Sequence, residues 1–174
     1  MTQDETVWRA PRFQVVRRNY QAADGARRVR EFVRHPGAVT ILPLVGEGNV
    51  CLIRNHRHSI KRTLIELPAG TLEAGEEPSV CAHRELAEET GYRARRMELL
   101  CEFYMSPGVL DERTWLFVAD DLTAGEVAPD EGEEIENLIV TWDEALAMIR
   151  DGSIQDAKTI VGLLRYDDFR RARA

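Results

Sequence analysis

The sequence predicts an α/β fold in which a mixed sheet lies between layers of helices. Short apolar segments bounded by turn residues indicate strands on both sides of one strongly helical stretch, and two amphipathic helices follow near the C-terminus. Elements in this order bury their apolar faces as an α/β/α sandwich around a mixed sheet. The chain of 174 residues, 44% of them hydrophobic, is long enough for one domain with a sizeable core.

Residues 1–36 are expected to form an N-terminal β-hairpin extension of a core that spans residues 37–174. Residues 12–19 and 27–34 are strand-like, and the sequence AADG at residues 22–25 is a turn signal between them. An isolated hairpin is marginal in water. The hairpin therefore either packs against a partner subunit or remains a plain edge hairpin.

The core is expected to contain five strands and, besides the central helix, two C-terminal helices. The strands are predicted at residues 38–45, 49–55, 97–104, 114–119 and 138–141, with an acidic loop at residues 120–136. Thr141 or Asp143 can cap a helix that ends near Gly152, and Asp156 can cap the last helix. The inward residues of the first helix are expected to be Ala145, Leu146, Met148 and Ile149. Those of the second helix are expected to be Ile160, Val161, Leu163 and Leu164. Residues 165–174, the charged tail, are expected to fray.

The central stretch, residues 70–92, combines a loop with a helix. Its sequence is GTLEAGEEPSVCAHRELAEETGY. Gly70 and Gly75 allow loop conformations that other residues resist, and Pro78 is suited to the first turn of a helix. Gly91 is suited to the position that ends one. We therefore expect a glycine-containing loop that leads directly into a single helix.

Three carboxylates of this helix stand where they do not favour its stability. Glu85, Glu88 and Glu89 are spaced at i, i+3 and i+4, so they share one face, and like charges at this spacing cost roughly 0.2–0.5 kcal/mol. They also lie in the C-terminal half, where the helix dipole disfavours anions. Clustered carboxylates are good ligands for Mg²⁺ or Mn²⁺, so a bound cation would turn this cost into binding. A solvated acidic face is the alternative.

The fixed positions of this stretch resemble the Nudix box. Five residues separate Gly70 from Glu76, and seven more separate Glu76 from the sequence RELAEETG at residues 84–91. The one departure is Tyr92, which stands where an aliphatic residue is more usual. The resemblance implies a Nudix-type sandwich and a metal-dependent hydrolase that cleaves a diphosphate linked to a nucleoside-like moiety. The metal site that it implies, for Mg²⁺ or Mn²⁺, consists of the Ala69 carbonyl, Glu85, Glu88 and Glu89.

Three short segments resemble the ADP-ribose pyrophosphatase subgroup of this family. They are NHR at residues 55–57, ELPAG at residues 66–70, and SPG at residues 106–108 with Glu112 beyond it. The resemblance implies substrate contacts at Arg57, Glu66, Pro107, Gly108 and Glu112, with Arg57 on a phosphate. The residues themselves leave open that Arg57 is a surface arginine and that Glu66 is a strand-end carboxylate.

The subgroup resemblance implies hydrolysis of ADP-ribose to AMP and ribose 5-phosphate. It also implies a homodimer in which the N-terminal hairpin packs against the partner subunit, and Phe13 or Phe32 of this hairpin is a candidate contact for adenine. One alternative is another nucleoside diphosphate sugar, such as GDP-mannose, on the same scaffold. The other is a Nudix domain that binds a nucleotide as a sensor without cleaving it.

The catalytic residues implied by the resemblance lie in the box and in the acidic loop. Glu133, with Glu134 as second choice, is implied as the base that handles the attacking water, and Glu88 and Arg84 complete the set. Arg84 is expected, together with Glu76, chiefly to hold loop and helix in position. A solvated charge run is the alternative interpretation of the acidic loop.

Composition narrows the remaining classes of function. A net charge of −7 argues against a general nucleic-acid binder, and it would repel a phosphorylated substrate unless cations and local arginines offset it. No apolar run approaches 18 residues, so we expect no membrane span and a cytoplasmic protein. The cysteines Cys51, Cys81 and Cys101 are expected to be free thiols, and the histidines His35, His56, His58 and His83 do not form a zinc ligand set.

Overall fold

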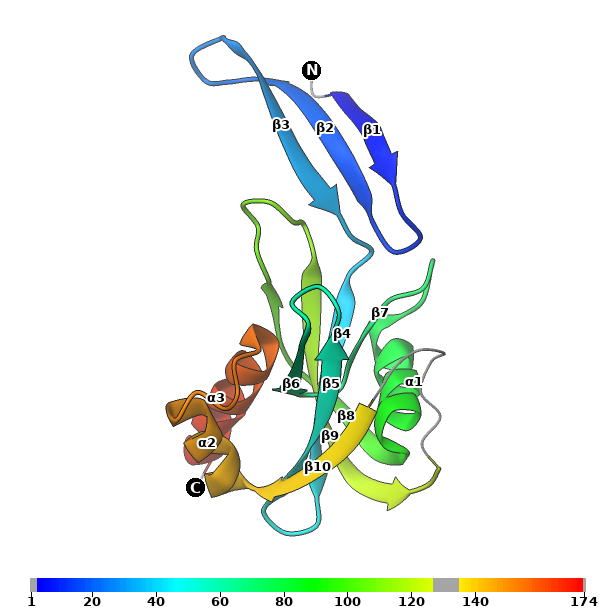
Figure 1. Cartoon of the computed structure of the whole chain (residues 1–174), viewed down its shortest axis with the longest axis vertical. Coiled ribbons are helices and arrows are strands. Elements are labelled where there is room, and N and C mark those ends of the chain that lie inside the picture. Colours follow the sequence, from blue (N-terminus) through cyan, green and yellow to red (C-terminus); the bar gives the residue numbers. More distant parts are fainter. Residues whose placement is uncertain (1–2, 127–134, 174) are drawn as a thin grey trace.

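The computed structural model describes residues 3–126 and 135–173 of the chain (Figure 1). In these residues a mixed sheet of seven strands lies between helices, and a separate sheet of three strands stands beyond its end. Helix α1 (Pro78–Thr90) lies on one side of the large sheet, and α2 (Trp142–Arg150) and α3 (Ala157–Arg171) lie on the other. The predicted α/β/α sandwich is therefore confirmed.

The small sheet is formed by the N-terminal strands β1 (Gln3–Arg9), β2 (Gln14–Gln21) and β3 (Arg27–Arg34), which pair antiparallel in that order. The predicted hairpin corresponds to β2 and β3, but β1 was missed. Its side chains are all exposed, so it carries no apolar alternation that a sequence pattern could reveal. Cross-strand charge pairs hold it instead, since Arg18 donates to Asp4 through Nε at 2.7 Å and Nη2 at 2.8 Å.

The small sheet joins the core through backbone hydrogen bonds. The Val33 N–H donates to the Val109 carbonyl at 2.8 Å, and the Asp111 N–H donates to the Val33 carbonyl at 3.0 Å. Gly37 follows with φ at 107°, and a Cβ there would lie 2.6 Å from the ring of Trp115. The chain therefore passes from one sheet to the other at a point where only glycine fits.

The large sheet has the strand order β10-β5-β4-β9-β8, with β6 beside β5 and β7 beside β4. Its strands are β4 (Ala38–Val45), β5 (Asn49–Arg57), β6 (Arg62–Glu66), β7 (Ala69–Thr71), β8 (Tyr92–Tyr104), β9 (Arg113–Ala124) and β10 (Ile135–Thr141). The pair β4 and β9 is parallel and the other pairs are antiparallel, which makes the sheet mixed.

The acidic loop predicted at residues 120–136 was too long at both ends. Residues 120–124 continue β9, because they pair with the first residues of β8, and Ile135 and Glu136 already belong to β10. Their polar side chains concealed strands that pairing across the sheet stabilises. Glu133 and Glu134 lie outside the described residues.

Side-chain caps start the two C-terminal helices where they were predicted. Thr141 and Glu144 form a reciprocal capping box at the start of α2. Asp156 caps α3 by accepting a hydrogen bond from the Thr159 N–H at 2.9 Å. The expectation that the chain frays from residue 165 onward was wrong for residues 165–171, because α3 continues to Arg171.

The inner face of α3 also differs from the prediction. Val161 and Leu164 are exposed, whereas Gly162 and Leu163 are buried. A Cβ at Gly162 would lie 2.5 Å from Cδ1 of Leu67, so the helix approaches the sheet most closely at its glycine. Further along, Asp167 accepts a hydrogen bond from Trp142 Nε1 at 2.9 Å, which ties the end of α3 to the start of α2.

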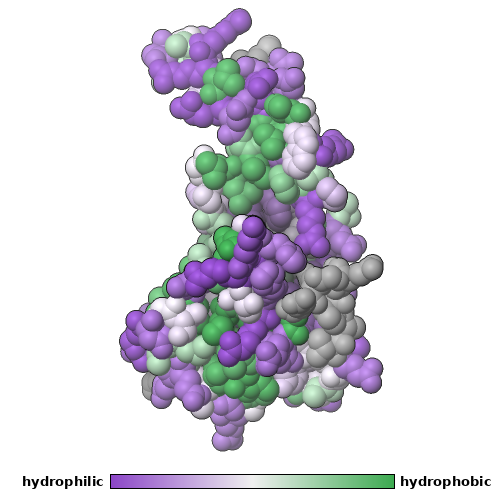
Figure 2. All heavy atoms as spheres, in the orientation of Figure 1, coloured by the Kyte–Doolittle hydropathy of each residue, from purple (hydrophilic) through white to green (hydrophobic). Residues whose placement is uncertain are grey.

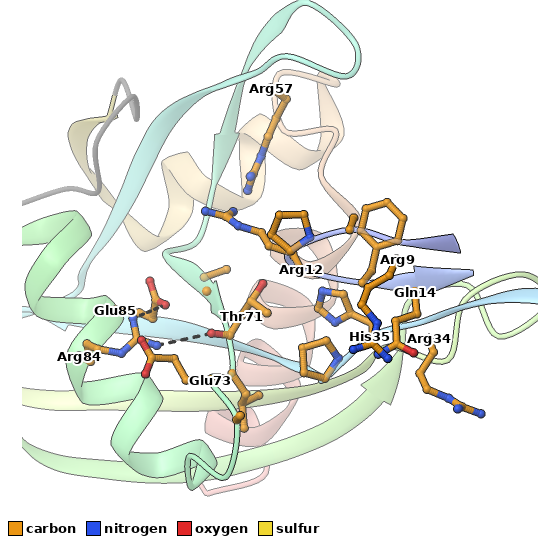
Figure 3. A pocket seen from close by; sticks show the side chains of 18 residues that line it. Arg9, Arg12, Gln14, Arg34, His35, Arg57, Thr71, Glu73, Arg84 and Glu85 are labelled. Carbon is orange, nitrogen blue, oxygen red and sulfur yellow. Dashed lines mark hydrogen bonds and ion pairs between the residues drawn. The ribbon is translucent and has the colours of Figure 1, made fainter. Parts of the chain in front are cut away.

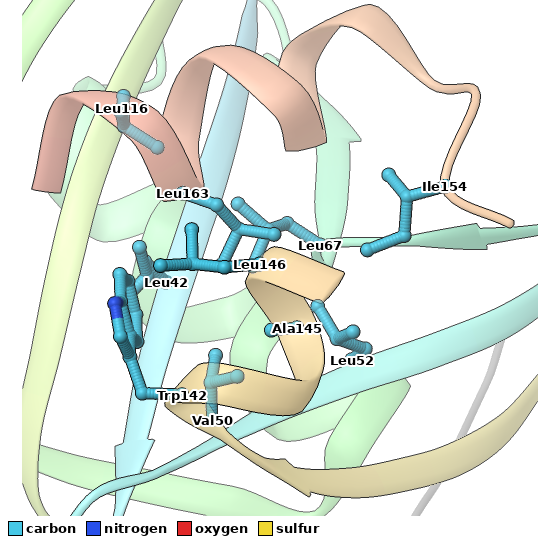
Figure 4. Packing of buried hydrophobic residues seen from close by; sticks show 10 residues of the cluster. All are labelled: Leu42, Val50, Leu52, Leu67, Leu116, Trp142, Ala145, Leu146, Ile154 and Leu163. Atoms are coloured by element: carbon cyan, nitrogen blue, oxygen red, sulfur yellow. The ribbon is translucent and has the colours of Figure 1, made fainter. Parts of the chain in front are cut away.

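Two apolar cores lie on opposite faces of the large sheet. The core beneath α2 and α3 consists of Leu42, Val50, Leu52, Leu67, Leu116, Trp142, Ala145, Leu146, Ile154 and Leu163 (Figure 4). The core beneath α1 consists of Val39, Ile41, Leu72, Cys81, Ala82, Leu86, Phe117 and Ala119. Alternate residues of the central strands supply the two cores, so the helix with the clustered glutamates is held firmly against the sheet.

Two further expectations concern membrane-spanning helices and the state of the cysteines. None of the helices in the described residues is long and apolar enough to cross a membrane. Cys51, Cys81 and Cys101 are free, as predicted.

Candidate active site

A cavity of about 760 Å³ opens where the small sheet meets the core (Figure 3). Its walls are residues 9–14 where β1 connects to β2, residues 34–36, Arg57 at the end of β5, residues 69–74, and Arg84 and Glu85 of α1. The loop of the box stretch therefore forms one wall, and the N-terminal sheet forms another.

The loop and the start of α1 follow the sequence signals. Gly75 has φ at 79°, a conformation that favours glycine, and Pro78 occupies the first turn of the helix. Gly91 ends the helix in the left-handed region, with φ at 75° and its N–H on the Ala87 carbonyl at 3.0 Å. The predicted boundaries of this helix are confirmed.

An ion pair between Glu76 and Arg84 fastens the loop to the helix. Arg84 donates to the two carboxylate oxygens of Glu76 through Nε and Nη2, both at 3.0 Å, and Glu76 also accepts from the Glu73 N–H at 2.9 Å. The hydrogen bonds from Arg84 lower the pKa of Glu76 to about 2. This geometry agrees with the positioning role expected for both residues.

The three clustered glutamates do not form a solvated acidic face. Arg84 Nη1 donates to Glu85 Oε1 at 2.7 Å and to Glu88 Oε2 at 3.0 Å. Glu89 is only 3% exposed, and its Oε2 accepts from the Ala69 N–H at 2.8 Å. A Cβ at Gly70 would lie 1.8 Å from the carboxylate carbon of Glu85, so glycine is required where this side chain meets the loop.

The donor set suits a hard divalent cation. Glu85 and Glu89 both reach the backbone of residues 69–70, and carboxylate oxygens are the ligands that Mg²⁺ and Mn²⁺ prefer. Within the described ranges, no three side chains of His, Cys, Asp or Glu are already grouped closely enough to hold an ion. Arg84 Nη1 bridges Glu85 and Glu88 in this structure.

Arg57 reaches the cavity from the end of β5, and Glu66 lies behind it. Arg57 donates to Glu66 through Nε at 2.8 Å and Nη2 at 2.5 Å, and Glu66 is fully buried. Burial acts to raise the pKa of Glu66, but Arg57 and Lys158 together hold it below its ordinary value. Glu66 is absent from the cavity wall and contacts it through Arg57.

The turn after β8 is not part of the cavity wall, but Asp111 beyond it accepts from the N–H of His35, a wall residue, at 2.8 Å. Pro107 and Gly108 are exposed and Glu112 is half-buried, and none of the three lines the cavity wall. The turn is closed by the N–H groups of Val109 and Leu110, which donate to the Ser106 carbonyl at 3.0 and 2.9 Å. These three predicted substrate contacts therefore do not share the cavity wall with Arg57.

The two candidate aromatic residues have different environments. Phe13 lines the cavity, and its ring centroid lies 5.5 Å from that of Trp8. Phe32 is not part of the wall; Arg18 and Arg34 lie over its ring at 4.9 and 5.7 Å. Of the two, Phe13 is the one that can meet a ligand in the cavity.

Sequence reasoning missed several basic residues of the cavity wall. Arg9, Arg12, Arg34 and His35 all come from the N-terminal segment. Arg12 and Arg57 direct their guanidinium groups toward the same part of the cavity (Figure 3). The many arginines of this segment were a general signal, but nothing in their spacing distinguished those that face the site.

Comparison with known proteins identifies the family. The NUDIX domain model matches residues 34–161. An ADP-ribose pyrophosphatase of Bacillus subtilis (strain 168) is 43% identical over 132 residues, which are 75% of this chain and 71% of that protein. The chain therefore belongs to the NUDIX domain family, whose hydrolases generally need a divalent metal ion.

Two further matches extend this comparison. A GDP-mannose pyrophosphatase of Cronobacter sakazakii (strain ATCC BAA-894) is 39% identical over 155 residues, which are 79% of this chain and 81% of that protein. A crystal structure of an ADP compounds hydrolase matches with a TM-score of 0.85 at 24% identity, covering 99% of this chain and 94% of that one. The structural match supports the Nudix fold over the whole chain.

Proposed function

We propose that the chain hydrolyses the diphosphate of ADP-ribose and releases AMP and ribose 5-phosphate. The observation that carries the proposal is the meeting of Glu85 and Glu89 with the backbone of residues 69–70, beside a cavity that Arg57 also enters. The relative from Bacillus subtilis, named an ADP-ribose pyrophosphatase, supports the choice of substrate.

The box residues are proposed to bind the cation that the reaction needs. Glu85, Glu88 and Glu89 would hold Mg²⁺ or Mn²⁺ with the Ala69 carbonyl. When bound, such an ion neutralises the diphosphate and lowers the pKa of a coordinated water. Arg84 offsets part of the repulsion between the carboxylates and, through Glu76, keeps the loop in place.

Arg57 is proposed to bind a phosphate of the substrate. A guanidinium has five N–H donors, and Glu66 takes two of those on Arg57, so the others remain for a ligand. The cavity volume suits a small nucleotide, since ligand pockets usually measure about 300–1,000 Å³. Phe13 is the proposed contact for the base.

Glu133 is proposed as the general base, with Glu134 as second choice. Supporting this, the segment that carries them ends at Ile135, which pairs with Asn55, two residues from Arg57. Close by, the Asn137 side chain donates to the Thr90 carbonyl at the end of the box helix, at 2.9 Å. The first described residues after the acidic segment therefore lie beside the strand that carries Arg57 and beside the end of the box helix.

The direct test is hydrolysis of ADP-ribose in the presence and absence of Mg²⁺, with the products separated by ion-exchange chromatography. We expect AMP and ribose 5-phosphate in equal amounts, and no turnover after chelation of the metal. Binding of ADP-ribose without any cleavage in Mg²⁺ or Mn²⁺ would instead indicate a nucleotide sensor.

GDP-mannose is the second candidate substrate, because a similarly close relative is named for it. The two substrates share the diphosphate, so Arg57 and the box glutamates serve both equally well. Comparison of kcat/KM for ADP-ribose and GDP-mannose decides between them. A higher value for GDP-mannose would overturn the choice of substrate while leaving the hydrolase proposal intact.

We also propose that the protein is a homodimer that uses the N-terminal sheet as its interface. Val7, Trp8 and Val29 of this sheet are 45%, 54% and 49% exposed. Hydrophobic side chains also gather near the junction of the sheets (Figure 2). A second copy would cover such apolar surface. Sedimentation that finds a fully active monomer at micromolar concentration would contradict this proposal.

A further inference from the structure

Arg57 belongs to a charge network centred on the buried Glu66, and the other members of this network do not line the cavity. Lys158, one of two lysines in the chain, stands in the first turn of α3, and its side chain is 14% exposed. Its Nζ donates to Glu66 Oε2 and to Asp156 Oδ1, the latter at 2.8 Å. Glu66 is thus held between Lys158 and Arg57.

The backbone around this network is fastened as well. Asp156 accepts from the N–H and the hydroxyl of Thr159 at 2.9 and 2.6 Å. The same hydroxyl accepts from the Leu67 N–H at 2.7 Å, directly beside Glu66. Hydrogen bonds through Thr159 therefore join the start of α3, which carries Lys158, to the chain directly after β6.

The charges of the network balance. Two carboxylates, Glu66 and Asp156, face two cations, Arg57 and Lys158. A buried carboxylate is costly unless it is fully paired, so removal of Lys158 would leave Arg57 as the sole cation for Glu66. Arg57 would then be drawn more strongly to Glu66, and its positive charge would act less on a ligand in the cavity.

We propose that Lys158 is a positioning residue for substrate binding, which acts through Glu66 to keep the free edge of the Arg57 guanidinium directed at a phosphate of the substrate. This inference rests on the proposed function, in which Arg57 contacts that phosphate. Lys158 itself does not line the cavity, so it acts on the substrate only through its partners.

The first test is the Lys158→Met variant, assayed with ADP-ribose. We expect KM to rise roughly tenfold while kcat stays within about threefold, because a phosphate contact made equally in ground state and transition state affects KM alone. Lys158→Arg, which keeps the charge, should restore most of the affinity. Lys61→Met, the same change at the exposed lysine between β5 and β6, should leave both constants unaltered.

The second test is a double-mutant cycle with Arg57→Met. If Lys158 acts through Arg57, then Lys158→Met raises KM in the natural chain but not in the Arg57→Met background. An equal rise in both backgrounds, or no rise in the natural chain, overturns the inference. No effect of Arg57→Met on KM overturns the phosphate contact itself, so the two failures are distinguishable.

Folding of the variants is checked by circular dichroism and thermal melting. If Lys158→Met does not fold, Lys158→Gln replaces it in the cycle, because glutamine keeps an N–H donor for Glu66 without the charge. An unchanged KM in the folded Lys158→Gln variant would overturn the inference in the same way.

Discussion

Substitution of Glu89 by glutamine tests the metal site most directly. Glu89 is almost fully buried, and its Oε2 accepts from the Ala69 N–H at 2.8 Å. Glutamine keeps an oxygen that can accept this bond, so the loop and helix should stay together. Removal of one of three like charges on the helix face should leave the stability of the metal-free chain unchanged or raise it by roughly 0.2–0.5 kcal/mol.

The expected loss of activity is much larger. A catalytic cation supplies several kcal/mol of transition-state stabilisation, and each 1.4 kcal/mol is about tenfold in rate. If Glu89→Gln removes about 3 kcal/mol of that stabilisation, kcat for ADP-ribose should fall by roughly a hundredfold or more. Because a ligand that binds only the folded state raises its stability, the variant should also lose most of the rise in melting temperature that Mg²⁺ causes.

Two measurements therefore suffice: turnover of ADP-ribose and melting temperature, each with and without Mg²⁺. Glu77→Gln is the matched control, since Glu77 precedes the same helix and makes no side-chain capping bond. It should resemble the natural chain in both measurements. Full activity of Glu89→Gln in Mg²⁺ would refute the assignment of Glu89 as a ligand.

Three further predictions follow from the site. Glu133→Gln should lower kcat about a hundredfold or more with little change in KM, and normal turnover would exclude it as the base. Gly70→Ala should abolish most turnover by displacing the Glu85 carboxylate; unchanged activity would contradict this packing. Because the folded-state pKa of Glu76 is about 2, below its ordinary 4.5, its stabilisation should fade as pH falls from 4.5 toward 2, and urea unfolding of Glu76→Gln should show less of this loss.

The elements that the sequence predicted well are those with local signals. Pro78 and Gly91 mark the ends of α1, and Thr141 and Asp156 mark the starts of α2 and α3, because each of these residues acts on the backbone within a few positions of itself. The spacing of Glu85, Glu88 and Glu89 predicted that they share one helix face, because the helix period needs no help from the rest of the fold. The Nudix family was inferred from the resemblance of the fixed positions in residues 70–92 to the Nudix box, and the family comparison confirms it.

The failures occurred where stability comes from distant parts of the chain. Strand β1 exists because its charges pair with β2, and residues 165–171 remain helical because Asp167 binds Trp142. Neither contact leaves an apolar pattern in the strand or helix that depends on it. Such segments look like polar tails until their partners are placed beside them.

The sequence by itself determined the chemistry of the box: three carboxylates on one helix face, a glycine loop before them, and an arginine to hold the two together. Only the tertiary structure decided what surrounds that chemistry. It buried Glu66 between Arg57 and Lys158, although Lys158 is 92 positions away, and it brought residues 9–14 into the wall of the cavity. The physical reason is that charge pairing and burial depend on proximity in space, which the folding of the sheet creates and the local sequence does not encode.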